Sequence, residues 1–118
     1  MTFYDSCGKP ISYSDDEECI YLFTGQPVAY FYDDTIYGFN GRHFGWFENG
    51  WIRDLHGYCA FYTEDASGSG PAKPARYAKP AKSAKNVKPA KCARNAKNAR
   101  AAKCLTWSVL SGVQFFQQ

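Results

Sequence analysis

The sequence lacks several features that would place the protein in a familiar class. It has no apolar run near the roughly 20 residues that cross a bilayer, and its N-terminus has neither the basic nor the apolar region of a secretory signal. The five cysteines, an odd number, form no C-x-x-C pair and no spacing typical of a zinc site. We therefore expect a soluble cytoplasmic protein with free thiols, no membrane segment and no cofactor.

Acidic residues are absent after Asp65, and basic residues are scarce before residue 71. Residues 1–70 contain all eleven acidic residues and only three basic ones, whereas the other eleven basic residues follow, so the two parts carry −8 and +11. From residue 71 to 103 the triplet x-Ala-Lys/Arg repeats, with only Val87 replacing an alanine. This change predicts one domain of three parts: a body (residues 1–70), a basic tail packed on it (residues 71–104) and an apolar C-terminal segment (residues 105–118) that closes it as a strand or plug.

A glycine-centred unit recurs in the body every sixteen or seventeen residues. Aromatic and β-branched residues flank each glycine, and Asn40-Gly41 is a strong signal for a two-residue hairpin loop. Short polar stretches separate the units. The pattern predicts an all-β fold of four pseudo-symmetric β-hairpins, an eight-stranded antiparallel meander, encircled by the extended basic tail. The glycines expected in its structural turns are Gly8, Gly25, Gly41 and Gly57.

Two-residue loops would sort the strand residues onto two faces, because side chains alternate along a strand. One face would carry the large residues and form the core. The other would carry the small set Ser12, Ala29 and Gly45, which suggests close approach around a pseudo-four-fold axis. Trp107 would lead the C-terminal segment back to the body. The expected core aromatic residues are Tyr13, Tyr30, Trp46, Tyr62 and Trp107, joined on the core face by Ile11, Val28 and Phe44.

Three stretches together resemble a known family. They are I-Y-L-F-T-G-Q-P-V-A-Y at residues 20–30, G-W-F-E-N-G-W-I-R-D at residues 45–54, and the Pro/Lys-rich tail that closes on Trp107. They are similar to the bacterial 4-fold β flower proteins, a functionally uncharacterised family. The resemblance implies a ring of four β-hairpins and brings no catalytic residues. The first unit departs from the cadence at Asp5 and Ser6, so we expect it to be an edge or capping hairpin.

The period of three in the tail is that of polyproline II. Both this conformation and a helix after Pro89, which the composition leaves open, would make alanine the buried contact. The acidic body would neutralise much of the tail charge, which favours contact between tail and body within one chain. Each exposed ion pair is worth only about 0–1 kcal/mol.

We interpret the protein as a structural or interaction module without catalysis. Its partner is unknown, and self-association stays open. A His/Cys cluster, from His43 with Cys59 or His56 with Cys7, is a minor hypothesis for a metal or thiol site. The main alternative is non-specific binding of nucleic acid or another polyanion. The basic residues that would carry it are Lys73, Arg76, Lys79, Lys82, Lys85, Lys88, Lys91, Arg94, Lys97, Arg100 and Lys103.

Overall fold

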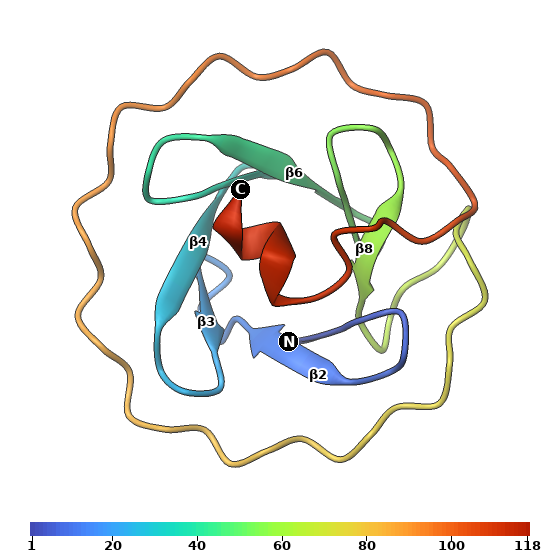
Figure 1. The fold of residues 1–118 in the computed structure, drawn as a ribbon, viewed down its shortest axis with the longest axis horizontal. Helices are drawn as coiled ribbons and strands as arrows, with labels where there is room; N and C mark the ends of the chain where they lie inside the picture. Colours follow the sequence, from blue (N-terminus) through green and yellow to red (C-terminus); the bar gives the residue numbers. More distant parts are fainter.

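The computed structural model describes all 118 residues and is a closed antiparallel β-barrel in which each strand pairs with its neighbours in the chain (Figure 1). The all-β, antiparallel prediction is confirmed. The expected edge hairpin is wrong, because β1 pairs with β8 through Tyr4 and Tyr62 and closes the ring. The elements are β1 (Thr2–Tyr4), β2 (Pro10–Tyr13), β3 (Cys19–Leu22), β4 (Pro27–Tyr32), β5 (Thr35–Tyr37), β6 (His43–Glu48), β7 (Trp51–Arg53), β8 (Cys59–Tyr62) and the 3-10 helix η1 (Val113–Gln117).

The four hairpin loops contain three residues, so the prediction of two-residue loops is wrong. In the third hairpin, Gly38 N–H donates to Arg42 O and Gly41 N–H donates to Gly38 O, both at 3.0 Å. Gly41 has a φ of 85°, whereas Asn40 is not in the left-handed region. A turn followed by a left-handed glycine is the usual three-residue hairpin. The two-residue Asn-Gly turn occurs instead between β6 and β7, at Asn49 and Gly50.

This loop length changes which residues face inward. In each hairpin the strand register shifts once, and in the third the shift leaves Phe44 between the paired residues His43 and Gly45. Such a bulge interrupts the alternation of side chains. Ile11, Val28 and Phe44 therefore pack in the central cluster rather than on the tyrosine face predicted for them.

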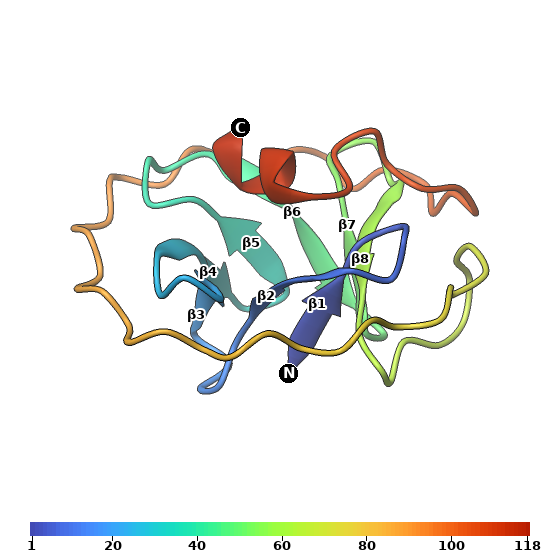
Figure 2. The same ribbon diagram turned by 60° about the horizontal axis from the view of Figure 1, so that its bottom comes forward.

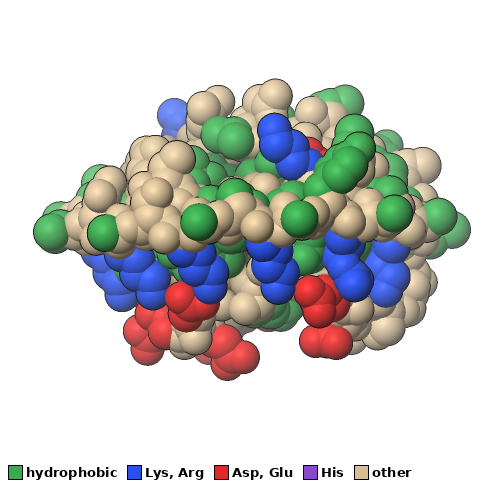
Figure 3. Space-filling view, turned by 90° about the horizontal axis from the view of Figure 1, so that it is seen from below, with side chains coloured by type: hydrophobic (Ala, Val, Ile, Leu, Met, Phe, Trp, Pro, Cys, Tyr) green, Lys and Arg blue, Asp and Glu red, His purple; other side chains and the backbone are tan.

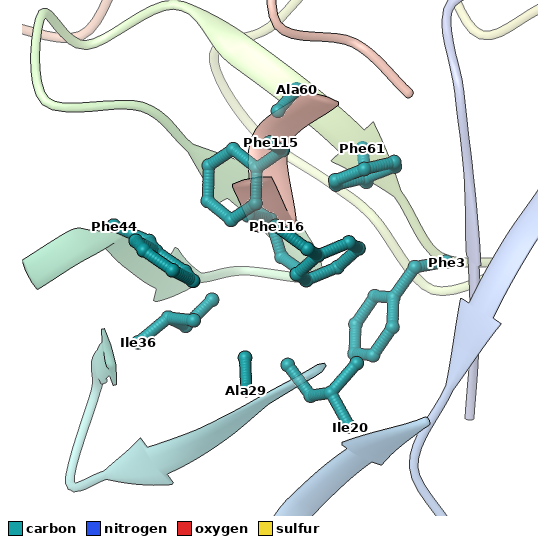
Figure 4. Packing of buried hydrophobic residues seen from close by; sticks show 10 residues of the cluster. Phe3, Ile20, Ala29, Ile36, Phe44, Ala60, Phe61, Phe115 and Phe116 are labelled. Atoms are coloured by element: carbon teal, nitrogen blue, oxygen red, sulfur yellow. The ribbon is translucent and has the colours of Figure 1, made fainter. Parts of the chain in front are cut away.

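The interior of the barrel is formed by the face that the sequence marked by its small residues (Figure 4). Gly45 is needed there, since a Cβ atom on it would lie 2.0 Å from Arg53 O. Phe115 and Phe116 of η1 enter the cluster from one end of the barrel (Figures 2 and 4). The cluster comprises Phe3, Ile20, Ala29, Ile36, Phe44, Ile52, Ala60, Phe61, Phe115 and Phe116.

The tyrosine-rich face is buried as well, but it packs in smaller clusters apart from the central one. Stacked pairs join neighbouring strands, with ring centroids 5.4 to 6.1 Å apart: Tyr4 with Tyr62, Tyr13 with Tyr21, and Tyr30 with Tyr37. At the fourth such position Trp46 pairs with Arg53. Trp107 packs 6.0 Å from the Trp51 ring and 5.9 Å from the Tyr62 ring, so phenylalanines of η1, not Trp107, enter the central cluster.

Residues 71–104 contain no helix, so the helix left open after Pro89 is not formed. They run around the outside of the barrel (Figure 1), and the molecule measures 36 × 35 × 22 Å. No residue from 75 to 100 is buried, so the alanines are not the buried contact that the triplet suggested. No helix in the fold has both the length and the apolarity that crossing a membrane requires.

Candidate functional site

The tail meets the barrel through backbone hydrogen bonds that recur every nine residues. The N–H groups of Tyr77, Asn86, Asn95 and Cys104 donate to the carbonyl oxygens of Gly8, Gly25, Gly41 and Gly57, in that order, at 2.8 to 3.1 Å. Nine tail residues, or three triplets, therefore correspond to one hairpin of sixteen or seventeen residues. The repeat of the tail and the repeat of the barrel are in register.

The four hairpin glycines form the turns and also allow the tail to pass close to the barrel. A Cβ atom on Gly8, Gly25 or Gly57 would lie 2.0 Å from a tail carbonyl oxygen, and on Gly41 the distance would be 2.1 Å. Real Cβ atoms do not approach oxygen so closely. Glycine is thus required both for the left-handed φ and for contact with the tail. The oxygens belong to Ala75, Ala84, Ala93 and Ala102.

One proline of the tail lies where the barrel carries a proline instead of an acceptor side chain. Pro80 lies beside Pro10 of the first hairpin, where the two residues line a shallow hollow. The residue two repeats further along the tail, Asn98, lies at the third hairpin, where His43 stands in place of Pro10. There Asn98 N–H donates to His43 Nδ1 at 3.1 Å. At this slot, proline of the tail meets proline of the barrel at the first hairpin, and a backbone donor meets an acceptor at the third.

Cations of the tail lie over aromatic rings of the outer barrel face. Lys82 Nζ is 4.4 Å from the centre of the Tyr13 ring, and Lys91 Nζ is 4.4 Å from that of Tyr30, nine residues later. A cation at this distance is attracted by the ring quadrupole. The remaining pairs are Arg76 with Tyr4, Lys85 with Tyr13 and Tyr21, Arg94 and Lys97 with Tyr32, and Arg100 with Trp46.

Carboxylates beside these rings pair with the same row of cations, which Figure 3 shows along one side of the tail. Hydrogen bonds from Lys82 and Arg100 lower the pKa values of Asp15 and Asp34, respectively. The paired tail side chains remain 40% to 50% exposed. The pairs are Lys79–Glu64 (3.5 Å), Lys82–Asp15 (3.0 Å), Lys85–Asp15 (3.2 Å), Lys88–Asp16 (3.9 Å), Arg100–Asp34 (2.7 Å), Arg100–Glu48 and Lys103–Glu48.

A family model described as the 4-fold beta flower protein matches residues 1–116 of the chain. The chain belongs to this family. No curated protein and no solved structure is significantly similar to it. In this beta flower protein the four hairpins are the repeated units around the axis, as the resemblance implied.

At the fourth hairpin of the beta flower, Arg53 joins the last residue of the tail to the segment that precedes the tail. Its Nη1 donates to Gly57 O at 2.7 Å and to Cys104 O at 2.9 Å, and its Nη2 donates to Ser69 O. The side chain is only 4% exposed. The sequence carries a signal for this role that was not among the predicted site residues: the other three repeats have tyrosine at the equivalent position, four residues before the glycine.

Asp54 fixes the fourth hairpin and the C-terminal segment, rather than pairing with Arg53 at the rim. Its Oδ1 accepts the N–H groups of His56 and Tyr58 at 2.9 and 3.0 Å. Its Oδ2 accepts the Ser108 hydroxyl at 2.5 Å. Ordinary turn chemistry and a buried hydrogen bond therefore account for this carboxylate.

The His/Cys positions of the beta flower show packing rather than a reactive cluster. His43 Nε2 lies 3.1 Å from Gly45 O, while Nδ1 accepts the tail N–H, so the ring is neutral. Burial lowers the pKa of His43 and raises that of Cys59 to about 11. The structure contains no group of three His, Cys, Asp or Glu side chains that could hold a metal ion. His56 and Cys7 are exposed.

Proposed function

We propose that this beta flower protein is a small cytoplasmic structural or interaction module without catalysis, in which the basic tail encircles the barrel and clasps it. One observation carries the proposal: each of the eleven tail cations contacts residues 1–70 through a carboxylate, an aromatic ring or, for Lys73, the Ala66 carbonyl. A tail built to bind an outside polyanion would leave cations uncommitted. The five unpaired cysteines support a reducing compartment.

Backbone hydrogen bonds would set the position of the tail on the barrel, whereas attraction between charges would only favour its docking. Exposed ion pairs are worth about 0–1 kcal/mol each and are screened by salt. Hydrogen bonds contribute about 0.5–1.5 kcal/mol each, and they also set the register because they depend on glycine and proline positions. Binding within one chain avoids the entropy lost when two molecules associate.

The second candidate is non-specific polyanion binding by the tail. The half-exposed Lys and Arg heads favour it, since a phosphate could reach them. A phosphate would have to compete for these cations with carboxylates that the same chain holds beside them. Such binding would be salt-sensitive because it releases counterions.

Trypsin digestion of the full chain tests the clasp. A free tail with a Lys or Arg at every third residue would be cut rapidly, so we expect residues 73–103 to be cleaved only as fast as the whole protein unfolds. Rapid cleavage within the tail, with the barrel still folded, would contradict the proposal.

Salt elution from immobilised DNA separates the two candidates. We expect the intact protein to elute at low salt, and the double variant Asp15→Asn/Glu48→Gln to be retained more strongly because it frees tail cations. The matched control is Glu18→Gln/Asp65→Asn, which removes the same charge from carboxylates without a tail partner. Strong retention of the unaltered protein would favour the polyanion binder.

A further inference from the structure

The end of the barrel opposite η1 contains a hollow that the tail does not use. Its volume is about 260 Å³, and it is lined by Met1, Glu17, Phe31, Asp33 and Phe47. Figure 2 shows the N-terminus at this end and η1 at the other. Ligand pockets usually measure roughly 300–1,000 Å³, so the hollow suits a ligand smaller than a typical drug.

The floor of the hollow is aromatic. The Phe31 and Phe47 rings are 5.6 Å apart at an interplanar angle of 66°, and Phe3 lies behind both at 6.3 and 6.1 Å. Phe31 and Phe47 are only partly buried, and both occupy the position six residues after a hairpin glycine. The equivalent residue of the first hairpin, Ser14, has a buried hydroxyl with no hydrogen-bond partner.

The rim of the hollow carries a net negative charge, since two carboxylates, Glu17 and Asp33, stand against one ammonium group, that of Met1. Glu17 and Asp33 are exposed, and neither forms an ion pair, although Asp16 and Asp34 beside them pair with tail cations. The Met1 ammonium group donates to Ser14 O at 3.0 Å. The excess of carboxylates over this one ammonium group disfavours an anionic ligand and favours a cation.

We propose that this hollow binds an alkylated ammonium group, such as the trimethylammonium group of a small molecule. A large, weakly hydrated cation gains from aromatic rings as well as from carboxylates. A hard metal ion would need six to eight oxygen ligands in place of the phenylalanine floor. The site is separate from the tail, so its failure would leave the proposed clasp standing.

Titration of the full-length protein with choline, followed by NMR of the backbone amides, tests the site. We expect saturable shifts centred on residues 17, 31, 33 and 47. The neutral analogue 3,3-dimethyl-1-butanol has the same shape without the charge, and we expect it to bind at least about tenfold more weakly.

Two variants assign the binding to the hollow. Glu17→Gln/Asp33→Asn should weaken choline binding about tenfold, because it removes both rim charges. Glu18→Gln, a neighbouring carboxylate that does not line the hollow, should leave it unchanged. Phe31→Leu should also weaken binding while keeping the position apolar. Absence of saturable shifts, equal binding of the neutral analogue, or unchanged binding by the Glu17/Asp33 variant would each overturn the proposal.

Discussion

Most strand side chains of the barrel are buried, whereas from residue 75 to 100 the tail buries none. The barrel is held by apolar area and by aromatic rings on both faces of its sheet. The tail is held by its backbone N–H groups, by close passage over glycines and by cations over rings. A segment with few large apolar side chains can thus be positioned by a surface whose repeat matches its own.

The largest expected effect concerns the barrel and its plug. Phe115→Ala removes a side chain with no exposed area that contacts Phe44 and Phe61, with ring centroids 6.0 and 5.5 Å away. It should lower the free energy of unfolding by about 3–5 kcal/mol. Denaturant unfolding measures this loss. Val109→Ala, at a residue 96% exposed, is the control and should change it by less than about 0.5 kcal/mol. Equal effects of the two changes would mean that η1 does not fill the barrel.

The next effect concerns the contact between barrel and tail. Gly25→Ala places a Cβ atom 2.0 Å from Ala84 O at a φ of 95°, so it should cost about 2–3 kcal/mol and expose the nearby tail to trypsin. Gly68→Ala is the matched control, because φ is 77° there but the nearest atom is 3.8 Å away. It should lower the free energy of unfolding only by the cost of placing alanine at a left-handed φ, about 1 kcal/mol. Identical losses would show that the tail does not pass over the glycine.

A smaller loss of stability is expected when a single backbone hydrogen bond between tail and barrel is removed. Asn86→Pro deletes the N–H that donates to Gly25 O and should cost about 1–2 kcal/mol. Ala101→Pro changes the same triplet position where the N–H makes no hydrogen bond to the barrel, so it should cost little or nothing. Unfolding curves of the two variants compare them directly. If Asn86→Pro were harmless, the backbone would not set the register.

The smallest effect is a dependence on pH through His43. Burial lowers its pKa in the folded protein, so its contribution is fully present above the unfolded value of about 6.5 and is lost as the pH falls below that value. Loss of the Asn98 bond should cost roughly 1 kcal/mol. Unfolding between pH 7.5 and 5.5 measures it, since the paired carboxylates titrate lower. His43→Asn should remove this slope, whereas His56→Asn, at an exposed residue, should keep it.

Much of the fold could be predicted because its signals are local. The glycine period marked four hairpins, and strand-forming residues between the glycines gave eight antiparallel strands. The inward face could not be read, because both faces of the strands are apolar and the three-residue loops shift the alternation by a bulge at Ile11, Val28 and Phe44. Asn40-Gly41 carries the same dipeptide as Asn49-Gly50, yet only the latter forms the two-residue turn.

The candidate site was less readable. The sequence identified the tail cations by type, but their partners depend on the nine-residue register between tail and barrel. Backbone hydrogen bonds set this register, and every non-proline residue carries the groups that form them, so the register leaves little trace in residue identity. The departure from tyrosine marked Arg53 as unusual, but its acceptors are three carbonyl oxygens, which residue identity does not reveal.

Four glycine-centred hairpins, a triplet tail and a strict separation of charge follow from the order of residues alone. Period and composition are properties of neighbouring residues, so they can be identified in the sequence without knowledge of the fold. Ring closure, the choice of the inward face, the filling of one end by η1 and the place where each tail residue meets the barrel arise only in the folded chain. Those outcomes depend on distances between residues far apart in the chain, which close packing and backbone hydrogen bonding set together.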